Sequence, residues 1–582
     1  MLPWERLRDK LYTLEGKSYA SYKALEGEYR FDRFVLFLDY VQADPSGPPS
    51  PMRVRVDQAE VRLPPDLWAT RVKRIALEDY LARRWQEAVR KVSRSGRGGR
   101  SAGFVVEAGN QQVLERTACR IQEDFVEIRS GIVLPSEGRR AVPKEAQVLL
   151  LEDLAQIAGM ALMADHPGRS LDVLQRHLEV AEDAEALRAQ LGTRGLVAFI
   201  ADGAILPREA GSDRPQLSHV VTFQSPPELR VTLEAPHRGS VSGLGIPRGV
   251  TLITGPEFSG KSGLLSAIAA SVYSHVPGDG REYCVTVPDA VASVREGGRR
   301  VEAVPLVPFV TMLPGGEDVR RYRTEYAPDV ASQVAAVMES LEIGTSLLLV
   351  DEDSTPPALL QRDAFRASVM PGAADPVVPL SDLARRLYAE HGVSTVLVCG
   401  MVSGYAAVAD TIIGMNGFHP VDLTAGVKQS AAGLPVPPVP PEGSAPPAAL
   451  GSRAGPFGSI PQRVPAPESV SSFRGRRARS EARGDRTIAI GRELVELSGV
   501  VQLVEPGQLR AIGDAVVLAA ERGYMDGSRS LREIVGLIDA ELSDRGLEAL
   551  SPFSGHPGDY ARPRRYELAA ALNRLRTLRI KA

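Results

Sequence analysis

The segment Gly255-Pro-Glu-Phe-Ser-Gly-Lys-Ser262 has the spacing G-x-x-x-x-G-K-[ST], which is typical of phosphate-binding loops. The residues before it, Gly249 to Thr254, are apolar and β-branched and predict a buried strand. The residues after it, Gly263 to Ser271, are rich in Ala, Leu and Ile and predict a helix. A strand that enters the loop and a helix that begins inside it are the setting in which this spacing binds phosphate. A chance match in a glycine-rich chain is the alternative, and the flanking segments argue against it.

In such a loop, backbone N–H groups and the N-terminus of the helix contact the phosphates. We therefore expect Lys261 to neutralise phosphate charge and Ser262 to bind Mg²⁺, so that ATP and Mg²⁺ are the expected cofactors. The residues expected to contact the nucleotide are Gly255, Pro256, Glu257, Phe258, Ser259, Gly260, Lys261, Ser262 and Gly263.

A second strand that ends in acidic residues should complete this kind of site. The segment Leu347-Leu-Leu-Val-Asp-Glu-Asp353 has that form. Asp351 is expected to support Mg²⁺ and Glu352 to orient the attacking water, while the role of Asp353 stays open. Acids at a strand end also commonly cap the next helix. The phosphate-binding loop earlier in the chain favours the functional interpretation for Asp351 and Glu352.

At 582 residues the chain is too long for one hydrophobic core, and we expect about three or four domains. Hydrophobic residues make up 43% and charged residues 24%, as is usual for globular proteins in water. The first residues, Met-Leu-Pro-Trp-Glu-Arg, do not resemble a signal peptide, and no apolar run is long enough to span a membrane. The sequence therefore predicts a cytoplasmic protein without a membrane partner.

The three cysteines, Cys119, Cys284 and Cys399, are far apart in the sequence. Their spacing fits no metal site, and an odd number argues against a disulfide framework. We expect them to be small core residues.

Apolar β-branched runs predict further strands, and apolar residues at helical spacing predict helices. The expected strands are Gly103–Glu107, Phe125–Arg129, Leu196–Ile200, Val220–Phe223, Leu229–Leu233, Ser346–Val350 and Ser394–Val398. The expected helices are Arg71–Val92, Leu149–Leu191 and Tyr566–Leu578. Strands that alternate with helices on this scale predict an α/β fold with a mainly parallel sheet.

Several blocks of sequence, together with the loop and the acid strand, resemble the ABC-class ATPases, a soluble family that is distinct from transporter subunits. The further blocks are Leu14–Lys23, Arg74–Leu81, Val113–Ala118, Leu196–Arg208, His275–Glu282, Gly392–Val398 and Ala570–Arg576. The resemblance covers nearly the whole chain except a stretch dense in Pro, Ala, Gly and Ser. That stretch runs from 429 to 472, and its composition predicts a disordered linker.

The resemblance implies an ABC-type P-loop nucleotide-binding domain, flanked by an N-terminal α+β domain and a small C-terminal α+β domain. The expected ranges are 1–164 for the N-terminal domain, 165–428 for the P-loop domain, 429–472 for the linker and 473–582 for the C-terminal domain. The resemblance also implies a homodimer. At least one relative is associated with RNA editing in mitochondria, which implies RNA or another nucleic acid as a partner.

Members of this family carry a signature of the type Ala-Ser-Gly-Ser-Thr-Ser-Gln before the acid strand. The corresponding segment here is Ala327-Pro-Asp-Val-Ala-Ser-Gln333, which keeps Ser332 and Gln333 as the signature residues. Most positions that would face the γ-phosphate of a partner protomer are changed. Pro328 has no N–H to donate, and Asp329 would repel a phosphate. The phosphate loop also departs from the family's Gly-Gly-Gly-Tyr-His-Gly-Lys-Ser-Thr, although Gly260-Lys-Ser262 remains.

Arginine-rich stretches at 83–100 and 474–486 fit salt-sensitive contacts with nucleic-acid phosphates. They contain no interleaved aromatic residues, and from composition alone solvated loops are an equal alternative. The leading functional hypothesis is therefore an ATPase, with Glu352 and Lys261 as catalytic residues, that acts with RNA. The alternative is a nucleotide-gated nucleic-acid-binding module with little or no hydrolysis. A P-loop kinase fits less well, because the blocks that resemble ABC ATPases surround the loop.

Overall fold

A computed structural model describes residues 1–95, 103–168, 170–362, 369, 375–400, 403–431, 457–473, 480–551 and 555–581. The chain forms two compact units, and the C-terminal region contributes segments to both. Unit 1 contains Met1–Glu182, Glu505–Ala511 and Leu542–Arg562, and unit 2 contains Asp183–Val504, Ile512–Glu541 and Pro563–Ala582. Among the described residues, no helix is both long enough and apolar enough to cross a membrane.

Unit 1 is built on a mainly antiparallel sheet with the strand order β1-β2-β3-β4-β8-β5, to which β7 adds by pairing with β8. Its strands are β1 (Leu2–Pro3), β2 (Gly27–Arg30), β3 (Val35–Leu38), β4 (Ser50–Asp57), β5 (Gly103–Val105), β7 (Cys119–Ile121) and β8 (Phe125–Val133). Alternate residues such as Val54, Val56 and Ile128 are fully buried, while their neighbours on the other face are charged. The alternation gives the sheet one apolar and one polar face.

The helices of unit 1 are α1 (Trp4–Tyr12), α2 (Gln58–Val61), α3 (Arg71–Ser95), α4 (Pro143–Gln147) and α5 (Leu154–Leu162), with a π-helical turn at Val148–Asp153. The longest of them, α3, packs along α5 and buries Trp85 completely. It also buries Asp79, whose carboxylate is ion-paired with Arg83 and Arg116. Arg116 in turn holds Glu505 at 2.7 Å, so this charged cluster includes a residue from the C-terminal region.

Unit 2 contains a central sheet with the order β17-β20-β21-β14-β22-β23, parallel except for β23. Its strands are β14 (Val250–Thr254), β17 (Ala290–Ser293), β20 (Leu347–Asp351), β21 (Ser394–Val398), β22 (Thr411–Asn416) and β23 (His419–Asp422). β14 lies in the middle and is buried along its whole length. The carboxyl ends of these parallel strands therefore meet at one edge of the sheet, where ligands of α/β proteins bind.

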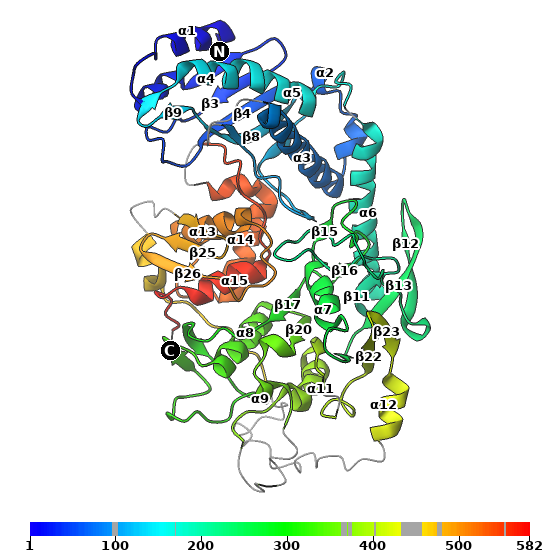
Figure 1. The fold of residues 1–582 in the computed structure, drawn as a ribbon. Coiled ribbons are helices and arrows are strands. Elements are labelled where there is room, and N and C mark those ends of the chain that lie inside the picture. Colours follow the sequence, from blue (N-terminus) through cyan, green and yellow to red (C-terminus); the bar gives the residue numbers. More distant parts are fainter. Residues whose placement is uncertain are drawn as a thin grey trace. The chain divides into compact units, whose positions relative to one another are not determined.

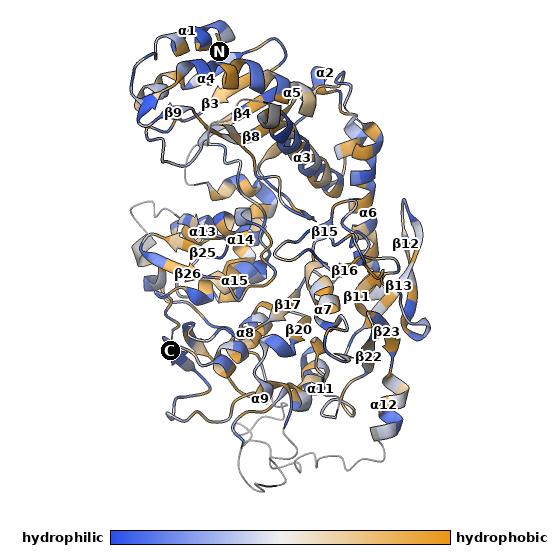
Figure 2. Cartoon of the chain, viewed as in Figure 1, coloured by the Kyte–Doolittle hydropathy of each residue, from blue (hydrophilic) through white to orange (hydrophobic). Residues whose placement is uncertain are grey.

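Helices cover the central sheet (Figure 1). They are α7 (Lys261–Ala270), α8 (Asp329–Ile343), α9 (Pro357–Leu360), α11 (Leu380–His391) and α12 (Thr424–Ala431). α8 and α11 each carry hydrophobic and hydrophilic residues (Figure 2), and their apolar residues form one core cluster with strand residues such as Leu252, Leu348 and Leu397. This packing is the amphipathic arrangement that the helical spacing predicts.

A second, antiparallel sheet of unit 2 has the order β12-β13-β11-β16. Its strands are β11 (Leu196–Ala201), β12 (Arg230–Ala235), β13 (Gly239–Pro247) and β16 (Val285–Thr286). Helix α6 (Leu171–Thr193) precedes it and runs from unit 1 into unit 2. Only two residues separate β13 from β14, so β11, β12 and β13 precede the phosphate loop in the chain, whereas β16 follows α7.

The C-terminal elements of the chain are a small antiparallel sheet and three helices. The strands are β24 (Ser480–Arg483), β25 (Thr487–Ile490) and β26 (Glu493–Glu496), and the helices are α13 (Pro506–Glu521), α14 (Leu531–Arg545) and α15 (Arg565–Arg574). α13 and α14 each contain residues of both units, whereas α15 lies wholly in unit 2 and packs against α8.

The strands expected at Leu196–Ile200, Ser346–Val350 and Ser394–Val398 are present within a residue of their expected bounds, and the sheet that contains the last two is mainly parallel. The strand expected at Val220–Phe223 is absent, although those residues are described. Phe223 is buried there. Its carbonyl accepts from the N–H of Gly203 and its N–H donates to the carbonyl of Ala204, but this pairing does not extend into a strand. All three cysteines are buried, as expected.

Part of the expected linker is packed. Residues 432–456 lie outside the described residues, but 457–472 are described and include the 3-10 helix Pro467–Phe473. Phe457 belongs to the core cluster of unit 2, and Arg463 donates to both carboxylate oxygens of the buried Glu342. A disordered linker over the whole of 429–472 is therefore wrong for its last part. A few large side chains anchor a segment whose average composition is that of a linker.

Candidate nucleotide site

The phosphate loop connects the carboxyl end of β14 to the N-terminus of α7, as its sequence predicts. Gly255 has φ +141°, and a Cβ there would lie 2.5 Å from the carbonyl oxygen of Met415. Gly260 has φ +100° and caps α7. Both positions require glycine, because other residues rarely adopt these angles and the first has no space for a side chain.

Lys261 is largely buried under the loop that it closes. Its Nζ donates to the carbonyl oxygens of Gly255 at 2.9 Å and Pro256 at 3.0 Å. The same Nζ lies 3.8 Å from Oε1 of Glu352. The lysine ammonium group is thus held at the mouth of the loop, opposite the acid strand.

Ser262 and Asp351 are brought together although they are far apart in the sequence. The Ser262 hydroxyl hydrogen-bonds to the Asp351 carboxylate. Burial raises the pKa of Asp351 above its usual value, while hydrogen bonds from the Asp353 amide and from Ser262 act in the opposite direction. A hydroxyl beside a partly desolvated carboxylate is a suitable pair of oxygen ligands for Mg²⁺, which usually takes its remaining ligands from water and phosphate.

Glu352 is held by Gly400, the second residue after β21. Its Oε2 accepts from the backbone N–H of Gly400 at 2.7 Å, and the Gly400 carbonyl accepts from Oγ1 of Thr254 at 3.4 Å. Neither Gly400 nor Thr254 is a site residue that the sequence predicts. The available signal was that Gly400 follows β21, the strand next to the one that carries the acids, and that Thr254 ends β14, the strand beyond it.

The outer surface of the loop is exposed at Pro256, Glu257 and Phe258. Phe258 is 92% exposed and has φ +58°, a backbone angle that is rare for a bulky residue. The hydroxyl of Ser259 donates to the carbonyl of Pro256 at 2.8 Å, which stabilises the loop from within. The side of Gly263 is open, with no atom near the position of a Cβ.

The two signature residues are buried in the protomer, so they are not at a surface where a partner's nucleotide could contact them. Ser332 is fully buried; its Oγ accepts from Glu296 N at 3.0 Å and donates to Asp329 O at 2.7 Å. Gln333 is 1% exposed and donates to Ser293 O and to Oγ1 of Thr355. Both signature residues thus lie inside the protomer, bonded to neighbouring backbone and side-chain groups. Helix α8 begins at Asp329, and its first turn is bonded to the neighbouring loop through Ser332.

The parallel sheet with a phosphate loop after its central strand and acids after a neighbouring strand defines a P-loop nucleotide-binding protein. Three family models match the chain: the P-loop domain of the ABC ATPases at residues 170–443, the N-terminal domain of the ATPases of the ABC class at 4–165, and the MRB1590 C-terminal domain at 479–581. The chain belongs to the ABC-class ATPases.

One curated relative is the uncharacterized protein MJ1628 of Methanocaldococcus jannaschii, which is 29% identical over 184 residues. The match covers 30% of this chain and 41% of that protein. Among solved structures, cbiO1 of Clostridium perfringens, part of the ABC transporter complex cbiONQ, is 12% identical with a TM-score of 0.24 and coverage of 41% of this chain and 93% of that one. The ADP conformation of MJ1267, an ATP-binding cassette of an ABC transporter, is 13% identical with a TM-score of 0.22, and the match covers 41% of this chain and 95% of that one.

Proposed function

We propose that this protein binds ATP with Mg²⁺ at the loop Gly255–Gly263, hydrolyses it, and acts with RNA or another nucleic acid as a cytoplasmic homodimer. The observation that carries the nucleotide part is the convergence of Lys261, Ser262, Asp351 and Glu352 at the carboxyl edge of one parallel sheet. These groups supply a cation, two oxygen ligands for Mg²⁺ and a carboxylate within one small region.

Each group has a defined part in the proposed reaction. Backbone N–H groups of the loop and the N-terminus of α7 bind the phosphates, and Lys261 exchanges its two carbonyl partners for phosphate oxygens. Ser262 and Asp351 would hold Mg²⁺, which supplies charge neutralisation when bound. Glu352, oriented by the Gly400 amide, orients the attacking water and accepts its proton.

Burial of Ser332 and Gln333 favours the second candidate function, a nucleotide-gated binding module with little turnover. In that case the partner protomer supplies few hydrogen bonds to the γ-phosphate, and ATP acts as an ordering ligand. The same loop and the same Mg²⁺ ligands serve both functions, so binding alone does not separate them.

Support for nucleic acid comes from the match to the MRB1590 C-terminal domain and from the described surface. Exposed cations gather where the last residues of the chain lie beside β19 (Tyr322–Thr324). This C-terminal basic surface consists of Arg320, Arg321, Arg323, Arg576, Arg579 and Lys581. Tyr326, 71% exposed, follows β19 and offers a ring for base stacking. The acids on the same surface are Glu317, Asp318 and Glu325. The predicted basic stretches fall partly outside the described residues, at 96–100 and 474–479.

Titration with a fluorescent ATP analogue tests the nucleotide part. Lys261→Ala should weaken binding at least tenfold, since a charge-assisted contact to phosphate is worth about 1.5–3 kcal/mol. Lys428→Ala, which removes an exposed lysine of α12 in the same unit, is the matched control and should bind like the native chain. Equal binding by native chain and Lys261→Ala would refute the assignment.

Phosphate release separates the two candidate functions. Turnover by the native chain that disappears in Glu352→Gln, but persists when the exposed Glu209 is changed to Gln, supports the ATPase. Nucleotide binding without turnover supports the gated module. Light scattering with and without nucleotide tests the homodimer, and RNA and DNA titrations at two salt concentrations test the nucleic-acid partner.

A further inference from the structure

The loop that follows β17, residues 294–299, contacts the acid strand of the nucleotide site. The backbone N–H of Arg295 donates to the carbonyl of Ser354 at 2.9 Å. The hydroxyl of Ser354 donates to the carbonyl of Asp351 at 3.2 Å. If binding of a cation and phosphates displaces Asp351 or its neighbours, these bonds would therefore displace the connecting loop as well.

The connecting loop also holds the N-terminal turn of α8. Glu296 donates its N–H to Ser332, and Gly298 N–H donates to the carbonyl of Ala327 at 2.8 Å. The Arg299 guanidinium donates to the carbonyl of Ser332 at 3.1 Å and to both oxygens of Glu339, at 3.1 and 3.0 Å. The guanidinium bonds of Arg299 are buried, and together with the backbone bonds they attach the connecting loop to the start of α8.

On its other side the connecting loop is bonded to C-terminal elements. The Glu296 carboxylate forms an ion pair with Arg574 of α15 and accepts from the N–H of Gly499 at 3.2 Å. The side chains of this pair are only 14% and 7% exposed. The next residue after the loop, Arg300, donates to the carbonyls of Leu575 at 3.0 Å and Leu578 at 2.9 Å. The segment that carries Arg576 and Arg579 is thus attached to the loop by two guanidinium groups.

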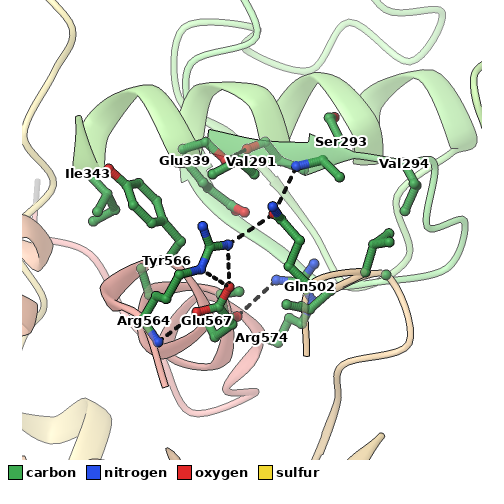
Figure 3. A pocket seen from close by; sticks show the side chains of 18 residues that line it. Val291, Ser293, Val294, Glu339, Ile343, Gln502, Arg564, Tyr566, Glu567 and Arg574 are labelled. Carbon is green, nitrogen blue, oxygen red and sulfur yellow. Dashed lines mark hydrogen bonds and ion pairs between the residues drawn. The ribbon is translucent and has the colours of Figure 1, made fainter. Parts of the chain in front are cut away.

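The contact between β17, α8 and α15 combines polar and apolar groups and is incompletely filled (Figure 3). A cavity of about 50 Å³ lies along it, lined on one side by Ser293 and Glu339 and on the other by Gln502, Arg564 and Glu567. Arg564 bonds to Glu567 and Gln502, and Gln502 accepts from the N–H of Ala292. The hydroxyl of Ser293, 3% exposed, has no hydrogen-bond partner among the described residues. A contact that contains unfilled space and several polar groups can shift with less loss than a close-packed apolar one.

We infer that nucleotide at the phosphate loop and a polyanion at the C-terminal basic surface bind with coupled affinities, and that the Glu296–Arg574 pair transmits the coupling. The inference rests on the proposed function for both binding sites. One continuous set of bonds runs from Asp351 through Ser354, the connecting loop and Arg574 to the segment that carries Arg576. Coupling free energies of this type change affinities by about 5- to 150-fold, and the factor must be the same in both directions.

The coupling is measured with a non-hydrolysable ATP analogue and a short single-stranded RNA of mixed sequence. The affinity for the analogue is determined with and without saturating RNA, and the affinity for RNA with and without saturating analogue. For the native chain we expect the two ratios to agree and to differ from one by at least about fivefold. Heparin in place of RNA distinguishes a general polyanion effect from one that needs bases.

The double variant Glu296→Gln/Arg574→Gln removes the pair without leaving an unpaired buried charge. It should bind each ligand alone as the native chain does, with a coupling factor near one. Glu296→Asp, which keeps the charge and shortens the side chain, should show reduced coupling. Arg565→Gln, which breaks the exposed pair of α15 with Asp539, is the control and should keep full coupling.

Independent binding of the two ligands by the native chain would overturn the coupling and leave the proposed function standing. Full coupling in a folded double variant would overturn the role of the pair. Failure of the native chain to bind the analogue or the RNA would overturn both the coupling and the corresponding part of the proposed function.

Discussion

The folded chain raises the pKa of Glu78 on α3. Replacement of Glu78 by Gln should therefore stabilise unit 1, and the stabilisation should increase with pH. The side chain is 6% exposed, and its Oε1 accepts from the N–H of Ile121 at 3.0 Å. Burial raises the pKa of Glu78 to about 7 from 4.5, although the Ile121 N–H and Arg120 act in the opposite direction. Gln keeps the acceptor oxygen and removes the ionisation.

The magnitude follows from the difference between the folded and unfolded pKa values. Between pH 4.5 and about 7 the folded chain binds a proton at Glu78 that the unfolded chain has released, so the stability of the native chain falls as pH rises through this range. The folded and unfolded pKa values of Glu78 differ by about 2.5, and each pKa unit corresponds to 1.36 kcal/mol of free energy, which gives about 3 kcal/mol. The advantage of Glu78→Gln should therefore grow by about 3 kcal/mol from acid to alkaline pH.

Tryptophan fluorescence is a selective assay for this change, because all three tryptophans, Trp4, Trp68 and Trp85, belong to unit 1. Denaturant unfolding of the full chain is followed by this signal at a series of pH values from about 4.5 to above 7. The difference in free energy of unfolding between variant and native chain is plotted against pH. Any constant cost of burying the amide group shifts the plot without changing its slope.

Glu123→Gln is the matched control, since that carboxyl is exposed at the β7–β8 turn and is solvated in both the folded and the unfolded chain. Its difference from the native chain should stay flat with pH. A flat difference for Glu78→Gln as well, or one that falls as pH rises, would refute the reasoning that burial controls the ionisation of Glu78.

Two further predictions concern unit 2. Arg463→Met leaves the carboxylate of Glu342 buried without its cation, so we expect the free energy of unfolding to fall by about 3–5 kcal/mol. Thermal unfolding and amide hydrogen exchange measure this loss. Unchanged protection of residues 457–473 against exchange would contradict it. Gly255→Ala introduces a Cβ against the carbonyl of Met415 at an unfavourable φ, so it should weaken binding of the ATP analogue at least tenfold, while Gly426→Ala in α12, where space is open, has little effect. Equal affinities for the two alanine variants would show that the loop relaxes around the new methyl group.

The features that sequence predicted well are those with a local cause. The spacing of Gly255, Gly260 and Lys261 fixes a loop between a strand and a helix, and the runs at Leu347 and Ser394 are apolar enough to specify buried parallel strands. The approach of Ser262 to Asp351 follows, since parallel strands end at one edge of a sheet. The roles proposed for the site residues and the domain boundaries at 164, 428 and 472 stay predictions.

The features that sequence missed depend on partners far along the chain. Ser332 and Gln333 suggest an outward signature, but their orientation is decided by Glu296, Ser293 and Thr355. The packing of 457–472 depends on single anchors such as Arg463, which an average over composition hides. No local pattern encodes these long-range contacts.

The distribution of C-terminal residues between the two units has a practical consequence for work with shortened forms of the protein. Glu505 neutralises Arg116 in unit 1, and Arg574 neutralises Glu296 in unit 2. A deletion of the C-terminal region would therefore remove one partner from a buried group of ion pairs in each unit, where Arg116 also contacts Asp79 and Glu296 also contacts Arg299. Loss of nucleotide binding after such a truncation would report damage to the interior of the remaining protein, so the role of this region has to be studied by point substitutions in the intact chain.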